Sequence, residues 1–386
     1  MRSDFTAGSE AEKNRTGRHK NIPVFIPHLG CPNNCVFCNQ RVISGRQFFD
    51  ENDVEKQIRT ACSTLNPEDC AEIAFFGGSF TGIDRGLMVR LLETAHAFLA
   101  DPRCPVKSVR CSTRPDYIDG EILSVLKKYG VETVELGIQS ISDGVLAASR
   151  RGHTAEMTVK ACRAVRAAGF RLIGQMMVGL PGSTPESERA TAEFICGEGA
   201  DGARIYPTVV FTRTELCDMA KAGAYVPLTD AEAVERTADL LEIFDAAGVP
   251  VIRTGLCSGE SLSSPEEVYG GASHPAIGEM AMSEVFRRRL DRALKEISVK
   301  TAGDAPEGDE NVPATVGDTA GSPGVGRTEK RLPELVIYVP QGCQSKVCGQ
   351  HKSNMSFIRE KYRIGKIKIL EKNDIIGYNI LLNIKY

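Results

Sequence analysis

Three cysteines, Cys31, Cys35 and Cys38, lie close together directly after an apolar, strand-like run at residues 22–27. Thiolates from one short loop can face a single centre, and soft sulfur ligands select zinc, copper(I) or iron–sulfur clusters. A structural zinc ion takes four protein ligands, but no fourth Cys or His follows at a finger or ribbon spacing. A cluster held by three cysteines leaves one iron open for a small molecule. A zinc or other thiolate site remains the alternative.

Four further turns carry groups that could bind a ligand, and each follows a strand-like run. They are Gly77-Gly78-Ser79, Arg114-Pro115, Gln139-Ser140 and Gly179-Leu180-Pro181-Gly182. Ligands of parallel α/β folds bind at the carboxyl ends of the strands. We therefore expect these turns and the cysteine loop to meet at one edge of a sheet.

The elements that must position these turns alternate regularly along the chain. Strand-like runs at 22–27, 72–76, 106–111, 133–138, 171–178 and 202–210 alternate with helix-like runs at 53–65, 87–99, 121–129, 155–168, 185–198 and 231–246. This alternation predicts an α/β fold with a parallel sheet covered by helices. A closed eight-unit barrel takes about 250 residues. The six units here favour an incomplete parallel (β/α)6 barrel, with a doubly wound sheet as the alternative.

The C-x3-C-x2-C run, with Phe37 just before the third cysteine, resembles the radical S-adenosylmethionine (SAM) superfamily. The resemblance implies a 4Fe–4S cluster held by Cys31, Cys35 and Cys38, with SAM on the fourth iron and Phe37 against the adenine. It also implies that the reduced cluster passes an electron to the sulfonium. The products are methionine and a 5′-deoxyadenosyl radical that abstracts hydrogen from a substrate.

The later turns extend this resemblance. Gly77 and Gly78 match the family turn whose backbone binds the methionine amino group, and Ser79 replaces the usual acidic residue. The segments around Arg114 and Gln139 resemble the branch that contains the Elongator catalytic subunit and oxygen-independent coproporphyrinogen oxidase. That resemblance implies that these positions line the SAM pocket, where Arg114 can fork to a carboxylate and Gln139 can bond ribose hydroxyls. A solvated arginine and a capping glutamine are the alternative.

The segment at residues 204–208, Arg-Ile-Tyr-Pro-Thr, is also similar to the Elongator-type proteins. Arg204 and Tyr206 either face the substrate or form a pair that closes the barrel. Nothing in the sequence supplies the length of an acetyltransferase domain or an acetyl-CoA loop, so acetyl transfer is not expected.

The chain has 13 cysteines, no tryptophan and a formal net charge of −3. The amino-terminal residues lack the apolar core of a secretory signal, so we expect reduced thiols and a cytoplasmic location. No apolar run reaches the roughly 18 residues of a membrane span. The following cysteines stand singly on predicted strands or helices and are expected to be buried thiols: Cys62, Cys70, Cys104, Cys111, Cys162, Cys196, Cys217 and Cys257.

Composition divides the chain into four parts. Residues 1–20 are predicted to be a disordered leader and 21–298 a catalytic core with a carboxyl-terminal extension. Residues 299–331, rich in Gly, Pro, Ala and Thr, are predicted to be a disordered linker, and 332–386 a small module. Residues 341–386 hold nine Lys/Arg and three Asp/Glu, a net charge of +6, which leaves −9 for the rest.

The order strand, short helix, turn, helix, strand in this small module resembles a KH-type RNA-binding domain. KH domains clamp nucleotide backbones with a Gly-x-x-Gly turn, but here Lys352 replaces the second glycine of the turn at residues 349–352. The module either contacts RNA electrostatically or is a docking domain with a basic face. Cys343 and Cys348 are too few to hold a second cluster.

These patterns predict a radical SAM enzyme that acts on RNA, with transfer RNA as the favoured candidate and flavodoxin or ferredoxin as the electron donor. Two alternatives stay open. One is a radical SAM enzyme with a small-molecule substrate, and the other is a non-catalytic zinc- or RNA-binding scaffold.

Overall fold

The computed structural model describes residues 19–26, 29–31, 35–44, 49–66, 68–256, 264, 266–303 and 333–385. The chain divides into two compact units, Met1–Gly278 and Glu279–Tyr386. In the described residues, no helix is both long and apolar enough to cross a membrane.

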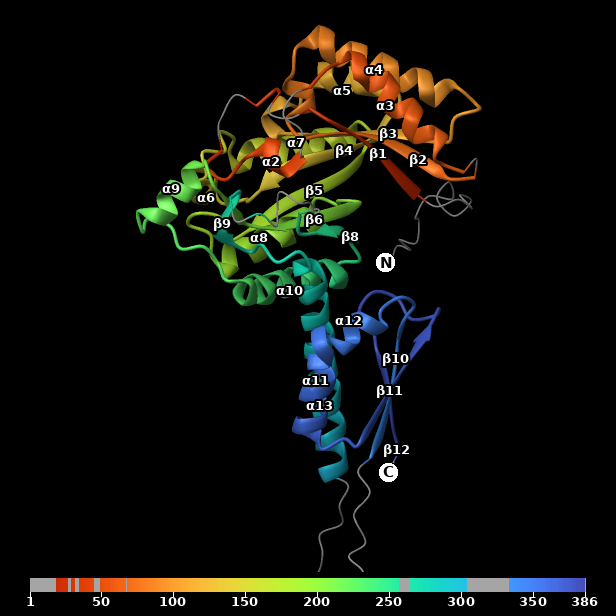
Figure 1. The fold of residues 1–386 in the computed structure, drawn as a ribbon, viewed down its shortest axis with the longest axis vertical. Helices are drawn as coiled ribbons and strands as arrows, with labels where there is room; N and C mark the ends of the chain where they lie inside the picture. Colours follow the sequence, from red (N-terminus) through yellow and green to blue (C-terminus); the bar gives the residue numbers. More distant parts are fainter. Residues whose placement is uncertain are drawn as a thin grey trace, which may run out of the picture. The chain divides into compact units, whose positions relative to one another are not determined.

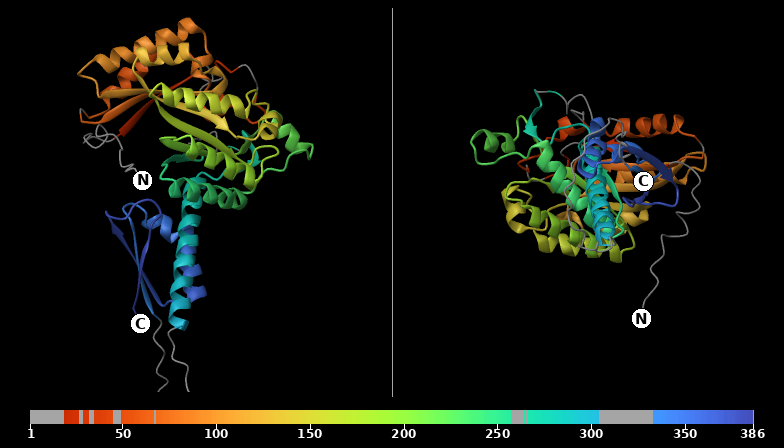
Figure 2. Two further views of the ribbon diagram at one scale, coloured as in Figure 1. Left: turned by 180° about the vertical axis from the view of Figure 1, so that it is seen from behind. Right: turned by 90° about the horizontal axis from the view of Figure 1, so that it is seen from below.

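A seven-stranded parallel sheet forms the centre of the first unit (Figure 1), and its strands follow one another in chain order. They are β1 (His19–Phe25), β2 (Cys70–Phe76), β3 (Val106–Thr113), β4 (Val131–Gln139), β5 (Arg171–Val178), β6 (Gly202–Pro207) and β8 (Val251–Thr254). Within the described residues β1 and β8 are the two edges of the sheet. The sheet therefore curls into a half-barrel instead of closing (Figure 2).

Helices connect the strands and cover the outer face of the sheet. The longer ones are α3 (Asn52–Ser63), α4 (Arg85–Ala100), α5 (Gly120–Lys128), α7 (Ala155–Ala167), α8 (Pro185–Gly197) and α10 (Asp230–Ala246). Shorter elements are α2 (Gln40–Ser44), η1 (Phe80–Gly82), η2 (Pro115–Tyr117), α6 (Asp143–Ala148), α9 (Glu215–Lys221) and the antiparallel pair β7 (Val209–Phe211) and β9 (Val268–Gly271).

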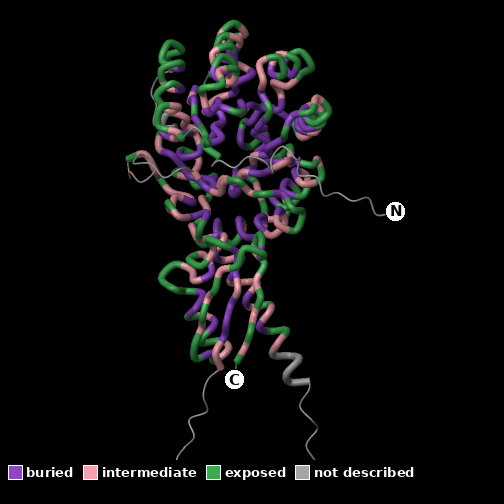
Figure 3. The backbone as a smooth tube through the Cα atoms, turned by 90° about the vertical axis from the view of Figure 1, so that its right-hand side faces the viewer, coloured by how far each residue is buried: buried purple, intermediate pink, exposed green. Residues whose placement is uncertain are grey.

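Local sequence explains where these helices begin and which side they bury. Thr154 caps α7, because its hydroxyl accepts a hydrogen bond from the Met157 N–H. Helix α3 buries Val54 and Ile58 on its apolar side. Burial follows the strands of the sheet, whereas the outer surfaces of the helices are exposed (Figure 3).

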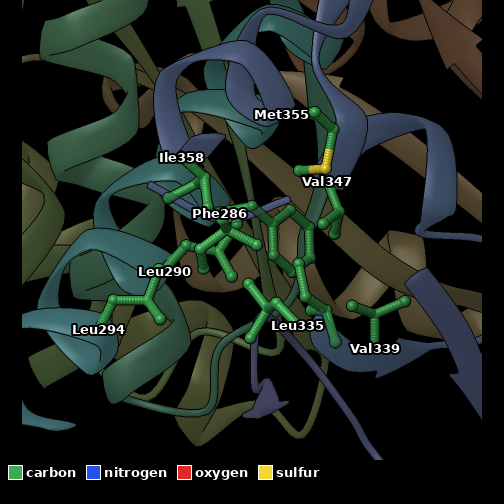
Figure 4. Close-up of a cluster of buried hydrophobic side chains, with 10 residues drawn as sticks. Phe286, Leu290, Leu294, Leu335, Val339, Val347, Met355 and Ile358 are labelled. Carbon is green, nitrogen blue, oxygen red and sulfur yellow. The ribbon is translucent and has the colours of Figure 1, made fainter. Parts of the chain in front are cut away.

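The second unit has its own hydrophobic core. It consists of α11 (Ile277–Gly303), which begins at the end of the first unit, then β10 (Glu334–Pro340), α12 (Gln344–Cys348), η4 (Gln350–Lys352), α13 (Ser353–Tyr362), β11 (Lys366–Lys372) and β12 (Leu381–Lys385). The sheet order is β11-β10-β12, with β11 parallel and β12 antiparallel to β10. Apolar side chains of α11, such as Phe286 and Leu290, pack against Leu335 of β10 and Ile358 of α13 (Figure 4).

The predicted fold class is confirmed, and the structure adds a seventh strand, β8. The single strand expected at residues 202–210 was wrong. It divides into β6 and β7, which belong to different sheets.

The predicted domain limits also differ from the structure. Strand β1 already begins at His19, inside the expected leader, while residues 1–18 lie outside the described residues. Helix α11 runs to Gly303, inside the expected linker, whose residues 304–331 are likewise not described. Most of α11, from Glu279, belongs to the second unit, because its apolar side chains complete the core of that unit. The expected boundary at residue 298 was therefore too late.

Candidate functional site

The cysteine loop follows β1 at the carboxyl edge of the parallel sheet. Cys35 is buried, whereas Cys31 and Cys38 are partly exposed. The Cys38 N–H donates to the Cys35 carbonyl at 3.0 Å, and the Val36 N–H donates to the Ser149 carbonyl at 3.2 Å. These bonds fold the end of the loop into a tight turn and fasten it to the segment after β4. Residues 32–34 lie outside the described residues.

The Gly-Gly turn after β2 packs directly against this loop. The Ser79 N–H donates to the Leu29 carbonyl at 3.0 Å, and the Ser79 hydroxyl lies 3.6 Å from the Cys31 sulfur. A Cβ on Gly78 would come within 2.3 Å of the Leu29 carbonyl oxygen. Glycine is therefore required here because two backbones touch. Ser79 is fully buried, so the residue that replaces the family's usual acidic residue packs directly against the cysteine loop.

Gly77 has φ of 91°, in the region that favours glycine. A Cβ at this position would meet only ordinary van der Waals contacts, because the nearest atoms beyond its chain neighbours would lie 3.5 Å away. The requirement at Gly77 is therefore conformational, while the requirement at Gly78 is steric.

Arg151 is a site residue that the sequence patterns did not predict. Its side chain is largely buried. One terminal nitrogen donates to the Cys35 sulfur at 3.4 Å and the other to the Gly137 carbonyl at 2.9 Å. A Cβ on Gly137 would lie 2.7 Å from the guanidinium. The only available signal was a basic pair, Arg150-Arg151, after a short helix, and the two behave differently: Arg150 pairs with Glu215 at the surface.

Arg114 is almost completely buried and does fork to a carboxylate, but the carboxylate is Asp116 of this chain. The two hydrogen bonds measure 2.9 and 2.8 Å. The Arg114 Nη1 atom is buried without a hydrogen-bond partner, so one donor remains for a bound group. The role of Arg114 in the SAM pocket stays a prediction.

His153 lies beside this ion pair, with its Nδ1 atom 4.0 Å from an Asp116 oxygen. Its Nε2 atom contacts the Ile138 carbonyl at 3.3 Å. Burial, reinforced by the nearby charges of Arg151 and Arg114, lowers the pKa of His153 to about 4. The imidazole is therefore neutral near pH 7.

Gln139 ends β4 with an unusual backbone. Its φ is 65°, a left-handed conformation that is uncommon for residues other than glycine. The side chain is buried and accepts a hydrogen bond from Gln175 of β5 at 3.3 Å. The structure thus adds Gln175, which no sequence motif singled out, to the neighbourhood of Gln139.

Arg204 and Tyr206 of β6 hydrogen-bond to each other at 3.0 Å. Arg204 is paired with Gln175 in the strand register. The residue before Gln175, Gly174, faces Ile195 of α8 on the outer side of the sheet, so Gln175 and Arg204 face the opposite side. Arg204 therefore points to the inner face of the sheet, where it pairs with Glu135 at 3.0 Å. Arg110 also pairs with Glu135, at 3.3 Å. Arg204 and Tyr206 thus form a hydrogen-bonded pair inside the half-barrel, and whether this pair faces the substrate or closes the barrel stays a prediction.

Phe37 packs with a small apolar cluster that includes Val36, Leu216 and Tyr225. Its ring is partly buried in that cluster, so α9 and the strand before it hold the aromatic residue next to Cys38.

The three loop thiols are close enough to influence one another. Burial raises the pKa of Cys38 to about 12, and Cys35 and Cys31 contribute in the same direction. In the described part of the chain, no three His, Cys, Asp or Glu side chains converge on one metal-ion position. In an iron–sulfur cluster each thiolate binds a different iron, so the sulfurs need not meet at one point.

The remaining cysteines divide into two groups. Cys70, Cys111, Cys162 and Cys217 are buried, as predicted, whereas the prediction was wrong for Cys62, Cys104 and Cys196, which are partly exposed. Cys257 lies outside the described residues. Cys343 and Cys348 are partly buried and pack against the core of the second unit.

Two family models match the chain in succession. The radical SAM superfamily model matches residues 25–195, and the radical SAM C-terminal domain model matches residues 200–287. The matched region includes the cysteine loop and every turn described above. The chain belongs to the radical SAM superfamily. It is therefore a radical SAM enzyme, and the cofactors of its family are a 4Fe–4S cluster and SAM.

The relatives of this radical SAM enzyme include proteins whose names describe an action on tRNA. It is 31% identical over 190 residues to a tRNA uridine(34) acetyltransferase of Methanocaldococcus jannaschii, covering 44% of this chain and 35% of that protein. It is 32% identical over 139 residues to human Elongator complex protein 3, covering 35% of this chain and 25% of that protein. The chain thus spans well under two thirds of the length of these relatives.

A solved structure resembles the fold of the radical SAM enzyme. It is the archaeal Methanocaldococcus infernus Elp3 with an N-terminal deletion, with a TM-score of 0.56 and 22% identity. The match covers 71% of this chain and 64% of the other.

Proposed function

We propose that Cys31, Cys35 and Cys38 bind the 4Fe–4S cluster of this radical SAM enzyme and that the enzyme acts on RNA. The observation that carries the first part is the loop itself. The loop carries three free cysteines, and a buried guanidinium donates to the Cys35 sulfur. Such a donor stabilises negative charge on sulfur, which suits a thiolate-bound cluster.

When bound, the reduced cluster and SAM supply a 5′-deoxyadenosyl radical for hydrogen abstraction. The chain's own residues bind, orient and shield these groups. The turn at Gly77 and Gly78 places backbone without side chains directly against the cysteine loop. Gln139 and Gln175 offer paired amides for hydroxyl groups, and Arg114 keeps a buried Nη1 donor. Phe37 supplies an aromatic face beside Cys38.

The RNA part of the proposal rests on the relatives' names and on the second unit. The chain is similar to the tRNA uridine(34) acetyltransferase over 190 residues and to the Elongator protein over 139 residues, and residues 341–386 carry a net charge of +6. The KH-like turn offers further support. Lys352, at the place of the missing glycine, has φ of 62°, so the backbone keeps a glycine-like conformation. We propose flavodoxin or ferredoxin as the electron donor.

Anaerobic reconstitution tests the cluster assignment. We expect about four iron atoms per chain and release of 5′-deoxyadenosine when SAM and a reductant are added. Cys35→Ala should lose both iron and SAM cleavage, whereas Cys162→Ala, which removes a buried thiol of α7, should keep both. Full turnover by the Cys35 variant would refute the ligand assignment.

Incubation with RNA tests the substrate class. The reconstituted enzyme is given total tRNA, and the nucleosides are analysed by mass spectrometry for a mass shift that depends on SAM. A modified nucleoside supports the proposal. SAM cleavage that total tRNA does not stimulate, and that yields no modified nucleoside, favours a small-molecule substrate.

A further inference from the structure

The sheet of the second unit is covered on one face only. Alternate residues of its strands, among them Ile337, Ile369 and Leu382, pack toward α11 and α13. Among the described helices of the second unit, none covers the opposite face (Figure 1). We call that opposite side the outer sheet face. It is made of Glu334, Val336, Tyr338 and Pro340 of β10, Lys366, Lys368, Leu370 and Lys372 of β11, and Leu381, Asn383 and Lys385 of β12.

Strand register arranges the outer sheet face in rows. Tyr338 is paired with Leu370 on one side and Leu381 on the other. Leu370 and Leu381 are 46% and 55% exposed, which is unusual for leucines on a folded sheet. The three side chains form an apolar row across the sheet, centred on an aromatic ring.

Lysines stand on both sides of this apolar row. Lys366 and Lys368 lie toward the beginning of β11, and Lys372 lies beyond the row at its end. Alternate residues of a strand are about 6.6 Å apart, so Lys366 and Lys368 form a regularly spaced pair of positive charges on one side of the row. Lys385 adds a fourth exposed lysine on β12.

Little negative charge offsets these lysines. The acidic residue of the outer sheet face is Glu334, whose carboxylate lies 2.6 Å from Lys368 and 3.8 Å from Lys366. Glu371 belongs to the helix side, where its carboxylate accepts a hydrogen bond from the Gln344 N–H. The outer sheet face therefore keeps a net positive charge.

We propose that the outer sheet face binds single-stranded RNA, with a base on Tyr338 and the phosphates along the lysines. This inference rests on the proposed function, because it names where the RNA substrate is held. Proteins that bind single strands combine a basic surface with aromatic side chains on which bases stack. The Lys372 ammonium now lies 4.5 Å from the centroid of the Tyr338 ring. A base would take that place and leave Lys372 for a phosphate.

The arrangement favours a single strand over a lipid surface. The apolar row consists of three side chains, and the central one, Tyr338, is only partly exposed, so the row offers little apolar area to a bilayer. A base needs only the flat face of the ring. Val336, which is paired with Lys368 in the strand register, is only 4% exposed, whereas Lys368 itself is exposed.

Fluorescence anisotropy on the full chain with a labelled single-stranded oligouridylate tests this inference. Lys366→Glu/Lys368→Glu should weaken binding more than tenfold at moderate salt and make the affinity less salt-dependent. Tyr338→Ala should weaken binding about tenfold, and Tyr338→Phe should retain it. Lys56→Glu/Lys107→Glu reverses two exposed lysines of the first unit and should leave binding unchanged.

The outcomes separate this inference from the proposed function. If the unmodified chain binds the oligonucleotide and the sheet variants bind equally well, the inference is overturned. Loss of binding in Lys352→Glu alone would assign the RNA to the KH-like turn instead. If the unmodified chain does not bind the oligonucleotide but floats with phosphatidylglycerol vesicles, the inference is overturned in favour of a lipid surface, and the tRNA assay decides separately on the RNA substrate. Circular dichroism confirms that each variant is folded.

Discussion

At the scale of single residues, buried polar groups around the cysteine loop carry most of the specific chemistry. His153 is the clearest case, because burial and the nearby charges of Arg151 and Arg114 keep it neutral although Asp116 lies beside it. Its folded-state pKa, about 4, lies below the ordinary value of 6.5. The unfolded chain therefore binds a proton between pH 6.5 and 4 that the folded protein does not, and stability falls as the pH decreases through that range.

We predict that His153→Gln flattens this part of the pH dependence. The unmodified protein should lose up to roughly 3 kcal/mol more stability than the variant between pH 7 and pH 4. Urea unfolding of both proteins at several pH values measures the difference. Parallel curves for the two proteins would show that His153 titrates normally.

Gly78 provides a steric prediction. Gly78→Ala should displace the cysteine loop, because the new methyl group would meet the Leu29 backbone at 2.3 Å. We expect a strong loss of iron after reconstitution. Gly120→Ala is the matched control, since nothing lies within 4 Å of its added methyl group. Equal iron contents in the two variants would show that the contact is not critical.

At the scale of elements, α8 and α10 support the turn that follows β5. Glu188 of α8 accepts a hydrogen bond from the Gly179 N–H at 2.7 Å and pairs with Arg236 of α10 through both carboxylate oxygens. The Tyr225 hydroxyl donates to the Gly179 carbonyl at 2.6 Å. The turn is thus fixed by charges and hydrogen bonds from two neighbouring helices.

A second ion pair joins the same two helices and serves as a comparison. Glu188→Gln breaks a buried pair and should cost about 3 kcal/mol or more. Asp239→Asn breaks the pair of Asp239 with the half-exposed Arg189 and should cost less than about 1 kcal/mol. Urea unfolding measures both, and equal losses would show that burial does not distinguish the pairs.

Sequence patterns predicted the helices and strands better than they predicted the interaction partners of individual side chains. The periodicity around residues 155–168 places α7 and its Thr154 cap, because both are local properties. Arg151 was missed because its partner, Cys35, lies 116 residues away. Arg114 was predicted to fork to a carboxylate, but the sequence pattern did not identify that carboxylate as Asp116, two residues away. The spacing of residues in the sequence shows where a charged side chain stands, but it does not show which group in the fold pairs with that side chain.

At the scale of the whole molecule, the parallel sheet follows from the strand–helix alternation. The role of α11 does not, because only the tertiary fold shows that its apolar residues complete the second core. The charge imbalance between residues 341–386 and the rest of the chain could be read directly, but its arrangement as the outer sheet face depends on strand register.

Thiol accessibility across the chain gives a prediction at this scale. In cluster-free native protein, iodoacetamide should modify Cys31 and Cys104, which are partly exposed, and spare Cys111 and Cys162. Burial raises the pKa of both spared thiols to about 12. Cluster loading should protect Cys31 but not Cys104, as read by mass spectrometry of peptides. Unchanged labelling of Cys31 would contradict its assignment as a ligand.

The left-handed backbone of Gln139 implies a compromise between thermal stability and activity. Such a conformation costs about 1 kcal/mol or more for a residue with a side chain, and glycine would relieve that cost. Gln139→Gly should therefore melt at a temperature no lower than the parent, yet release 5′-deoxyadenosine more slowly because it lacks the amide. A variant with a higher melting temperature and an unchanged rate of 5′-deoxyadenosine release would show that the strained backbone of Gln139 does not contribute to activity.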